Sequence, residues 1–169
     1  MLNQRDIKAL IKTVIKELNM YSYDALMLVF RTGLVESNYE HLRQKIGRGS
    51  RIGIARSFFQ IEPWVARSII NDYIKYRKSI RRDLERVCMC DLSRMDDESE
   101  NDFLALQLTG NIMFGIAMCR LKYRPVPKAI PKASDIIKQA GYWKKYYNTA
   151  GGKGTVKKFT KIVEKYERG

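Results

Sequence analysis

Residues 23–37, YDALMLVFRTGLVES, form a stretch that would be apolar nearly all the way round a helix. A helix of that kind belongs in a protein interior. Ser22 stands just before it and is a typical N-cap residue, because its hydroxyl oxygen can accept a backbone N–H of the first turn. The sequence therefore predicts a buried central helix from Tyr23 to about Glu36, ending in polar residues that can reach solvent.

Apolar residues recur at helical spacing on both sides of this segment, with charged residues between them. Pro63 suits the first position of a helix, in which Trp64, Ile69, Ile70 and Tyr73 are available for packing. The glycines Gly47, Gly49 and Gly53 predict a loop or short hairpin over residues 38–57. The fold is thus expected to be all-α with a small Gly-rich loop or β-hairpin lobe. Further helices are expected at residues 7–18, 63–76, 79–87, 102–123, 135–147 and 155–166, with the acidic residues 96–100 capping the one at 102–123.

The chain has 169 residues, of which 45% are hydrophobic, and this composition excludes a disordered protein. No window approaches about 18 uninterrupted apolar residues, so a membrane span is excluded as well. The first residues lack the apolar core of a signal peptide.

The net charge is +14, and residues 124–169 supply +9 of it, with 12 basic and 3 acidic side chains. Such a segment suits a polyanionic partner such as DNA, anionic lipid or a cell-wall polymer.

The three cysteines, Cys88, Cys90 and Cys119, cannot all pair with one another, and reduced thiols are expected without a secretion signal. Together with His41, the one histidine, they could in principle supply a zinc site. The Cys-x-Cys spacing is tighter than the usual gap between zinc ligands, and there is no second pair. We therefore predict packing cysteines and no bound metal.

A carboxyl group at the end of a buried helix is a candidate general acid. Cleavage of a glycosidic bond needs a carboxyl group that stays protonated near neutral pH, and apolar surroundings achieve this by disfavouring the anion. Glu36 follows Gly33-Leu34-Val35 at the end of the predicted central helix. A solvated carboxylate at a helix end is the alternative, and for an isolated glutamate it is the commoner one.

Three motifs in the chain follow one another in the order seen in a known enzyme family. Glu36-Ser37 ends the central helix, residues 54–63 read IARSFFQIEP, and residues 109–115 read TGNIMFG. This resembles the lysozyme-like lytic transglycosylases, in which Glu-Ser ends a helix and a Gly-Ala-Ser-Gly-Leu-Met-Gln-Ile-x-Pro run opens the next one. An Asn-Ile-x-x-Gly segment then lies on a later helix of that family. The chain departs from the pattern at Ile54, which replaces the first glycine, and at Arg56-Ser57, which replace Ser-Gly.

Over its length the chain is most similar to the lysozyme-like proteins of tailed-phage virions. The resemblance implies one lysozyme-like domain over residues 1–169, with 124–169 as a basic helical extension packed on it. It also implies a place in the phage tail or interior, synthesis in the host cytoplasm, contact with other virion proteins and action on peptidoglycan without a cofactor. The residues that carry this similarity are 42–44, 59–63, 118–124, 142–149 and 152–155.

Carried over to this chain, the resemblance makes Glu36 the catalytic acid and base. Gln60 and Asn111 would contact the substrate, and Ser37 would orient the acid or contact sugar. Tyr39 lies close behind Glu36 in the sequence and could either line the cleft or anchor the loop. The bond cleaved would be the β-1,4 linkage between N-acetylmuramic acid and N-acetylglucosamine.

The type of reaction depends on a second carboxylate. Inverting and retaining hydrolases use two carboxyl groups. A lytic transglycosylase manages with one, since its product closes to a 1,6-anhydro sugar. The chain has no Asp or Glu between Glu40 and Glu62, which favours the lyase. Glu62 is a possible second catalytic group, although a carboxylate just before Pro63 also suits a helix N-terminus. Glu40 and Asp72 are weaker candidates.

Two features near the C-terminus have simple structural interpretations. The aromatic residues Tyr142, Trp143, Tyr146 and Tyr147 indicate packing of the C-terminal segment on the core, with sugar stacking as the alternative. The run at residues 151–155, GGKGT, lacks the Gly-Lys-Ser/Thr order of a phosphate-binding loop. It predicts a turn, with Thr155 capping the last helix. The rival function is a structural or DNA-contacting virion protein that keeps the fold without activity.

Overall fold

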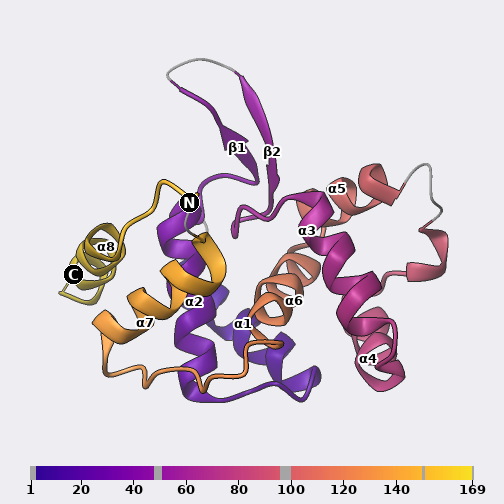
Figure 1. Ribbon diagram of the computed structural model, residues 1–169, viewed down its shortest axis with the longest axis horizontal. Coiled ribbons are helices and arrows are strands. Elements are labelled where there is room, and N and C mark those ends of the chain that lie inside the picture. The colour runs from indigo at the N-terminus through magenta and orange to yellow at the C-terminus, as the bar shows by residue number, and fades with distance from the viewer. Residues whose placement is uncertain (1–2, 48–50, 96–99, 150, 169) are drawn as a thin grey trace.

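The computed structural model describes residues 3–47, 51–95, 100–149 and 151–168, which are mostly helical with one two-stranded sheet (Figure 1). The predicted loop tip with Gly49, and all of the acidic stretch at 96–100 except Glu100, lie outside these ranges. The elements are α1 (Gln4–Glu17), α2 (Tyr23–Ser37), β1 (Arg43–Lys45), β2 (Ile52–Arg56), α3 (Pro63–Ser68), the π-helical turn η1 (Ile69–Ile74), α4 (Lys78–Cys88), the 3₁₀ turn η2 (Leu92–Arg94), α5 (Glu100–Gly110), α6 (Ile112–Tyr123), α7 (Ile136–Trp143), the π-helical turn η3 (Lys144–Asn148) and α8 (Val156–Arg168). The predicted helical class is confirmed, and the small lobe is a hairpin.

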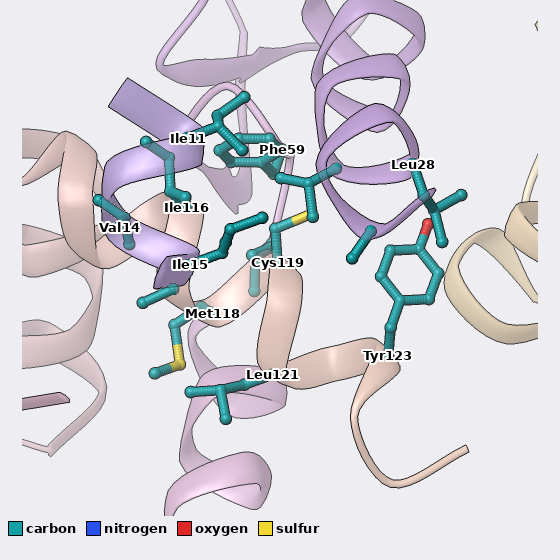
Figure 2. Packing of buried hydrophobic residues seen from close by; sticks show 14 of the residues in the cluster. Ile11, Val14, Ile15, Leu28, Phe59, Ile116, Met118, Cys119, Leu121 and Tyr123 are labelled. Carbon is teal, nitrogen blue, oxygen red and sulfur yellow. The ribbon is translucent and has the colours of Figure 1, made fainter. Parts of the chain in front are cut away.

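Helices α2 and α6 form the centre of the core. In α2 every residue from Ala25 to Leu34 is buried, and the Ser22 hydroxyl accepts the Ala25 N–H at 3.0 Å, as its sequence position predicts. Helix α6 is buried from Phe114 to Leu121. Helix α1 packs its apolar face against both, and side chains of α1, α2 and α6 meet around Cys119 (Figure 2). Burial of this apolar surface is the main stabilising contribution to the fold.

The helix expected at 102–123 is wrong as a single element, because it divides at Asn111. Helices α5 and α6 meet there at an angle of 108°. Asn111 is extended (φ −112°, ψ 98°), and its Oδ1 accepts the Phe114 N–H at 3.1 Å. Gly110 thus ends one helix and Asn111 caps the next, since glycine and asparagine favour helix ends over helix interiors.

Across the described ranges no single helix has the length and apolar composition to cross a membrane. The bent pair of α5 and α6 reaches that length and composition only when its two helices are counted together.

A tight loop connects the hairpin to α3. Strands β1 and β2 are antiparallel, and the backbones of Arg56 and Ile61 exchange two hydrogen bonds of 2.8 Å. Between them Ser57 (φ 64°) and Gln60 (φ 50°) adopt the left-handed conformation, which glycine enters at least cost. Ser57 stands where the family pattern has glycine, and its Oγ accepts the Phe59 N–H at 3.1 Å. Pro63 then occupies the first turn of α3, as predicted.

Gly115 of α6 lies directly beneath this loop. A Cβ atom at Gly115 would approach the Ser57 Cβ to 3.0 Å. The glycine of the Asn-Ile-x-x-Gly motif therefore leaves room for the loop of the earlier motif. Two motifs that are well separated in the sequence meet here as one packed unit.

The C-terminal segment folds back over α2. Arg31, buried within α2, pairs with Glu167 and donates to the carbonyl oxygen of Ala133 and the side chain of Gln139, each at 2.8 Å. Gln139 in turn donates to the Asp24 carbonyl oxygen at 3.1 Å. Figure 1 shows α7 and α8 lying beside α2, on the side away from α4. Buried charged and amide groups thus hold the described part of the C-terminal segment against the central helix.

We expect Gly115→Ala to destabilise the protein by about 1–3 kcal/mol, since the added methyl group must displace the Ser57 loop. Gly110→Ala is the matched control, because its Cβ would meet nothing within 4 Å and alanine is favoured over glycine in a helix. Chemical denaturation of both variants measures the difference. Equal free energies of unfolding in the two variants would contradict the proposed contact.

Candidate active site

The Glu36 carboxyl lies in the last turn of α2, where the core meets solvent. Its Oε1 accepts the indole N–H of Trp143 at 3.1 Å. Burial raises the pKa of Glu36 to about 7, while this hydrogen bond and the positive charges of Lys122 and Lys158 act in the opposite direction. Near neutral pH the protonated and ionised forms are therefore present in comparable amounts, and the group can both donate and accept a proton.

Trp143 is held in place by the C-terminal segment. Its side chain is 1% exposed, and its ring packs against Phe159 with the ring centroids 5.2 Å apart. Gly154 approaches the ring so closely that a Cβ there would lie 2.3 Å from it. The glycine turn is held by Lys144, whose ammonium group donates to the carbonyl oxygens of Thr149 and Gly152 at 2.8 Å.

The GGKGT run is therefore a turn, and Thr155 at its end is a helix cap, as predicted. The Thr155 Oγ1 accepts the Lys158 N–H at 3.1 Å. The aromatic cluster at residues 142–147 likewise packs on the core. Tyr142, Trp143 and Tyr147 are buried, and Tyr147 donates its hydroxyl hydrogen to the Phe59 carbonyl oxygen at 2.7 Å. These three rings have no free face for a sugar.

A cleft of about 830 Å³ opens in front of Glu36. The hairpin, the start of α3 and the C-terminal segment form its walls, and Lys122 of α6 also lines it. Two carboxylates, Glu36 and Glu62, line this cleft. Its lining residues are Val35, Glu36, Gln44, Lys45, Ile46, Gly47, Ala55, Gln60, Glu62, Trp64, Val65, Ser68, Ile69, Lys122, Trp143, Tyr147, Asn148, Thr149, Gly151, Gly152, Lys153, Gly154 and Lys158.

A second cavity, of about 680 Å³, lies between the end of α2 and α8. Val35, Glu36 and Lys158 line both cavities, so the Glu36 side chain stands at their boundary. Ile162 and Tyr166 contribute apolar surface from α8 to this second cavity. The carboxyl group is therefore bordered by open space on two sides, although most of its surface is shielded by protein.

Ser37 has a structural role. Its hydroxyl donates to the Phe58 carbonyl oxygen at 2.7 Å, and the same oxygen accepts the Tyr39 N–H at 3.2 Å. The end of α2 is thereby tied to the tight loop. Ser37 is buried, so it positions the backbone beside Glu36.

Tyr39 does not line the cleft, contrary to its expected substrate contact. Its side chain is 2% exposed, and its hydroxyl donates to the Phe30 carbonyl oxygen at 2.7 Å. A Cβ at Gly33 would lie 2.5 Å from the tyrosine ring, so the glycine is needed for this packing. Tyr39 instead anchors the loop, the other alternative that its position in the sequence left open.

The remaining expected site residues divide between the cleft and the frame of the fold. Gln60 lines the cleft, and its amide group donates to the Ser57 carbonyl oxygen at 2.8 Å. Glu62 also lines the cleft and is the N-cap residue of α3, without a side-chain hydrogen bond to that helix. Asn111 lines neither cavity, and its Nδ2 donates to the Cys88 carbonyl oxygen at 2.7 Å. Its expected contact with substrate is therefore replaced by a capping role.

Lys122, Trp143 and Trp64 are among the cleft residues that were not predicted as site residues. Lys122 donates to the Tyr147 carbonyl oxygen at 2.9 Å, and burial lowers the pKa of its ammonium group. A lysine inside the apolar 112–123 stretch was the available signal for it. Trp143 was assigned to packing, and nothing local in the sequence indicates its contact with Glu36. Trp64 was expected to pack in the core, yet it is exposed.

Among the residues that the structure describes, no three His, Cys, Asp or Glu side chains are grouped so that they could hold a metal ion. Cys88, Cys90 and Cys119 are buried free thiols. Burial raises the pKa of Cys90 to about 11, and it raises the pKa of the other two thiols as well. These cysteines are packing residues.

Comparison with protein families, with curated proteins and with solved structures found no match to this chain.

Relative to the native protein, Glu36→Gln should gain stability as the pH rises from 4 to 8. The native pKa of about 7 lies above the ordinary value of 4.5, so the contribution of Glu36 to stability is fully present below about pH 4.5 and is lost as the pH rises through 7. Glutamine does not titrate, so its advantage over glutamate should grow across this range to at most about 3 kcal/mol. Denaturant unfolding of both proteins from pH 4 to 8 measures it. Glu40→Gln removes an exposed carboxylate nearby, and an equal effect there would count against the buried acid.

Trp143→Phe should raise the pKa of Glu36 above 7. The indole N–H favours the ionised carboxylate, and phenylalanine keeps most of the packing while removing the donor. Carbon-13 NMR titration of the glutamate carboxyl resonances measures the change, with Glu36→Gln identifying the resonance. An unchanged or lower pKa would show that the hydrogen bond does not act on the acid.

Proposed function

We propose that the protein cleaves the glycan strand of peptidoglycan, with Glu36 as the catalytic acid and base. The observation that carries the proposal is a shielded carboxyl with a pKa of about 7 on the wall of a large cleft. A catalytic acid works best when its pKa is near the operating pH. The substrate class comes from the motif resemblance, and the order of α2, hairpin, α3 and α6 is consistent with a lysozyme-like fold.

In the proposed reaction, the protonated Glu36 gives its proton to the glycosidic oxygen between N-acetylmuramic acid and N-acetylglucosamine. The bond from C1 to this oxygen breaks, and positive charge develops at C1. The resulting Glu36 carboxylate then accepts the proton of the muramyl C6 hydroxyl as that oxygen attacks C1, which closes the 1,6-anhydro ring. One carboxyl group serves both steps, because its pKa lets it exist in either form near neutral pH.

A hydrolase mechanism is the variant in which water attacks C1. It would use Glu62 as the second carboxylate, since Glu62 lines the same cleft as Glu36. The lyase is preferred because Glu62 occupies the position before Pro63, where a carboxylate suits the positive end of a helix dipole, and because no carboxylate besides Glu36 and Glu62 lines the cleft within the described residues. From the resemblance we further propose a virion protein of a tailed phage that opens the wall locally during genome delivery.

The decisive experiment is mass spectrometry of the products released from purified peptidoglycan by the native protein and by Glu36→Gln. Anhydromuramyl products from the native protein alone are expected, with a rate that falls about tenfold per pH unit above pH 7 as the acid form is lost. Reducing-end products would make the enzyme a hydrolase and assign Glu62 the second role. Release by neither protein from several wall types would overturn the proposed function.

A second candidate is a structural or DNA-contacting virion protein without activity. It is favoured by α8, where Lys157, Lys158, Lys161 and Lys165 are exposed and make no ion pair with any described residue. Binding of this kind would weaken steeply with salt and would be unchanged in Glu36→Gln. Glycan cleavage that depends on Glu36 would argue against it as the main function.

A further inference from the structure

Trp64 is exposed on the wall of the cleft. It lies in the first turn of α3, two residues after Glu62, and its side chain is 53% exposed. Burying an aromatic ring of this size is favourable, so a tryptophan that stays open to water forgoes that stabilisation. Trp143, the other tryptophan, is 1% exposed. The fold therefore uses one tryptophan for packing and leaves the ring of the other free.

The cleft that Trp64 lines combines apolar surface with amide groups. Ile46, directly after β1, lines the same cleft and is 46% exposed. Gln44 also lines it and lies over Gly53, where a Cβ would be 2.0 Å from the Gln44 Oε1. The Gln44 amide makes no hydrogen bond to any residue that the structure describes, so its donors and acceptor are free for a ligand. Gln60 supplies a second amide on the cleft.

Such a surface matches the chemistry of a pyranose ring. The axial C–H groups of a sugar form an apolar face that packs on an aromatic ring, while its hydroxyl and N-acetyl groups form hydrogen bonds with amides. A purely apolar partner would leave the Gln44 amide without a partner on binding, which is costly.

We propose that Trp64 is a sugar-stacking platform, and that with Gln44 it forms a subsite for an N-acetylated hexose of the glycan strand. This inference rests on the proposed function for its substrate class. It adds a binding site on the α3 side of the cleft, apart from the Glu36 carboxyl. Trp64 acts through ground-state binding of the strand, whereas Glu36 transfers protons.

Acrylamide quenching of intrinsic fluorescence tests the subsite without any need for cleavage. Because Trp143 is buried, the quenchable emission of the native protein comes from Trp64. Addition of the N-acetylglucosamine tetramer should shift this emission to shorter wavelength and protect it from acrylamide. Saturating tetramer that leaves the quenching unchanged would overturn the proposal.

Calorimetric titration of variants with the same tetramer provides the second measurement. Trp64→Ala should weaken binding at least about tenfold, and Trp64→Phe should recover part of the loss because it keeps a stacking face. Tyr23→Ala is the matched control, since Tyr23 is 61% exposed and lines neither cavity. Because Trp64 is exposed, the unfolding temperature of Trp64→Ala should stay close to that of the native protein, which separates lost binding from lost folding.

The two proposals fail in distinguishable ways. Tetramer binding that depends on Trp64, without cleavage of any peptidoglycan, would support the subsite and overturn the enzymatic function. Cleavage that depends on Glu36 but is equal in the native protein and Trp64→Ala, together with equal tetramer binding, would overturn the subsite and leave the enzyme in place. In the second case the exposed ring would be assigned to contact with another protein.

Discussion

The contact between Trp143 and Glu36, made through the indole hydrogen bond, joins residues 107 positions apart, and the burial that raises the pKa of Glu36 depends on it. It forms only because residues 124–168 return over α2, where Arg31 and Gln139 hold them. Without that cover, Glu36 would end a helix in water and would be an ordinary anion. The basic C-terminal segment is therefore part of the site, although its charge alone suggests a separate polyanion-binding extension.

The chemistry available to Glu36 follows from a balance between burial and nearby positive charge. A fully buried carboxyl would keep its proton and could not act as a base, while a solvated one would lose it and could not act as an acid. The Trp143 hydrogen bond and the charges of Lys122 and Lys158 offset part of the effect of burial, and the resulting pKa of about 7 makes both forms accessible. Burying Lys122 has its own cost, which shows in its lowered pKa. The packing of the surrounding helices offsets the unfavourable burial of Glu36 and of Lys122.

The sequence predicted those features that local chemistry determines. The Ser22 cap, the buried α2, the start of α3 at Pro63 and the cap at Thr155 all follow from residue type and position. The division of the 102–123 helix was missed because its apolar run outweighed one capping asparagine. Whether the side chains of Tyr39 and Trp64 are buried or exposed was not predictable, since an aromatic ring is equally suited to a core and to a binding surface. Which of the two it occupies depends on contacts between distant segments.

The tight loop forms although residues 54–57 differ from the motif that they resemble. Ser57 adopts the left-handed conformation that glycine would take more readily, and its Oγ hydrogen bond to the Phe59 N–H offsets part of that cost. Gly115 of α6 provides the room beneath the loop. Gln60, in the same loop, lines the cleft. Ile54, which also differs from the motif, is exposed and does not line the cleft, so this difference leaves the wall that faces Glu36 unaltered.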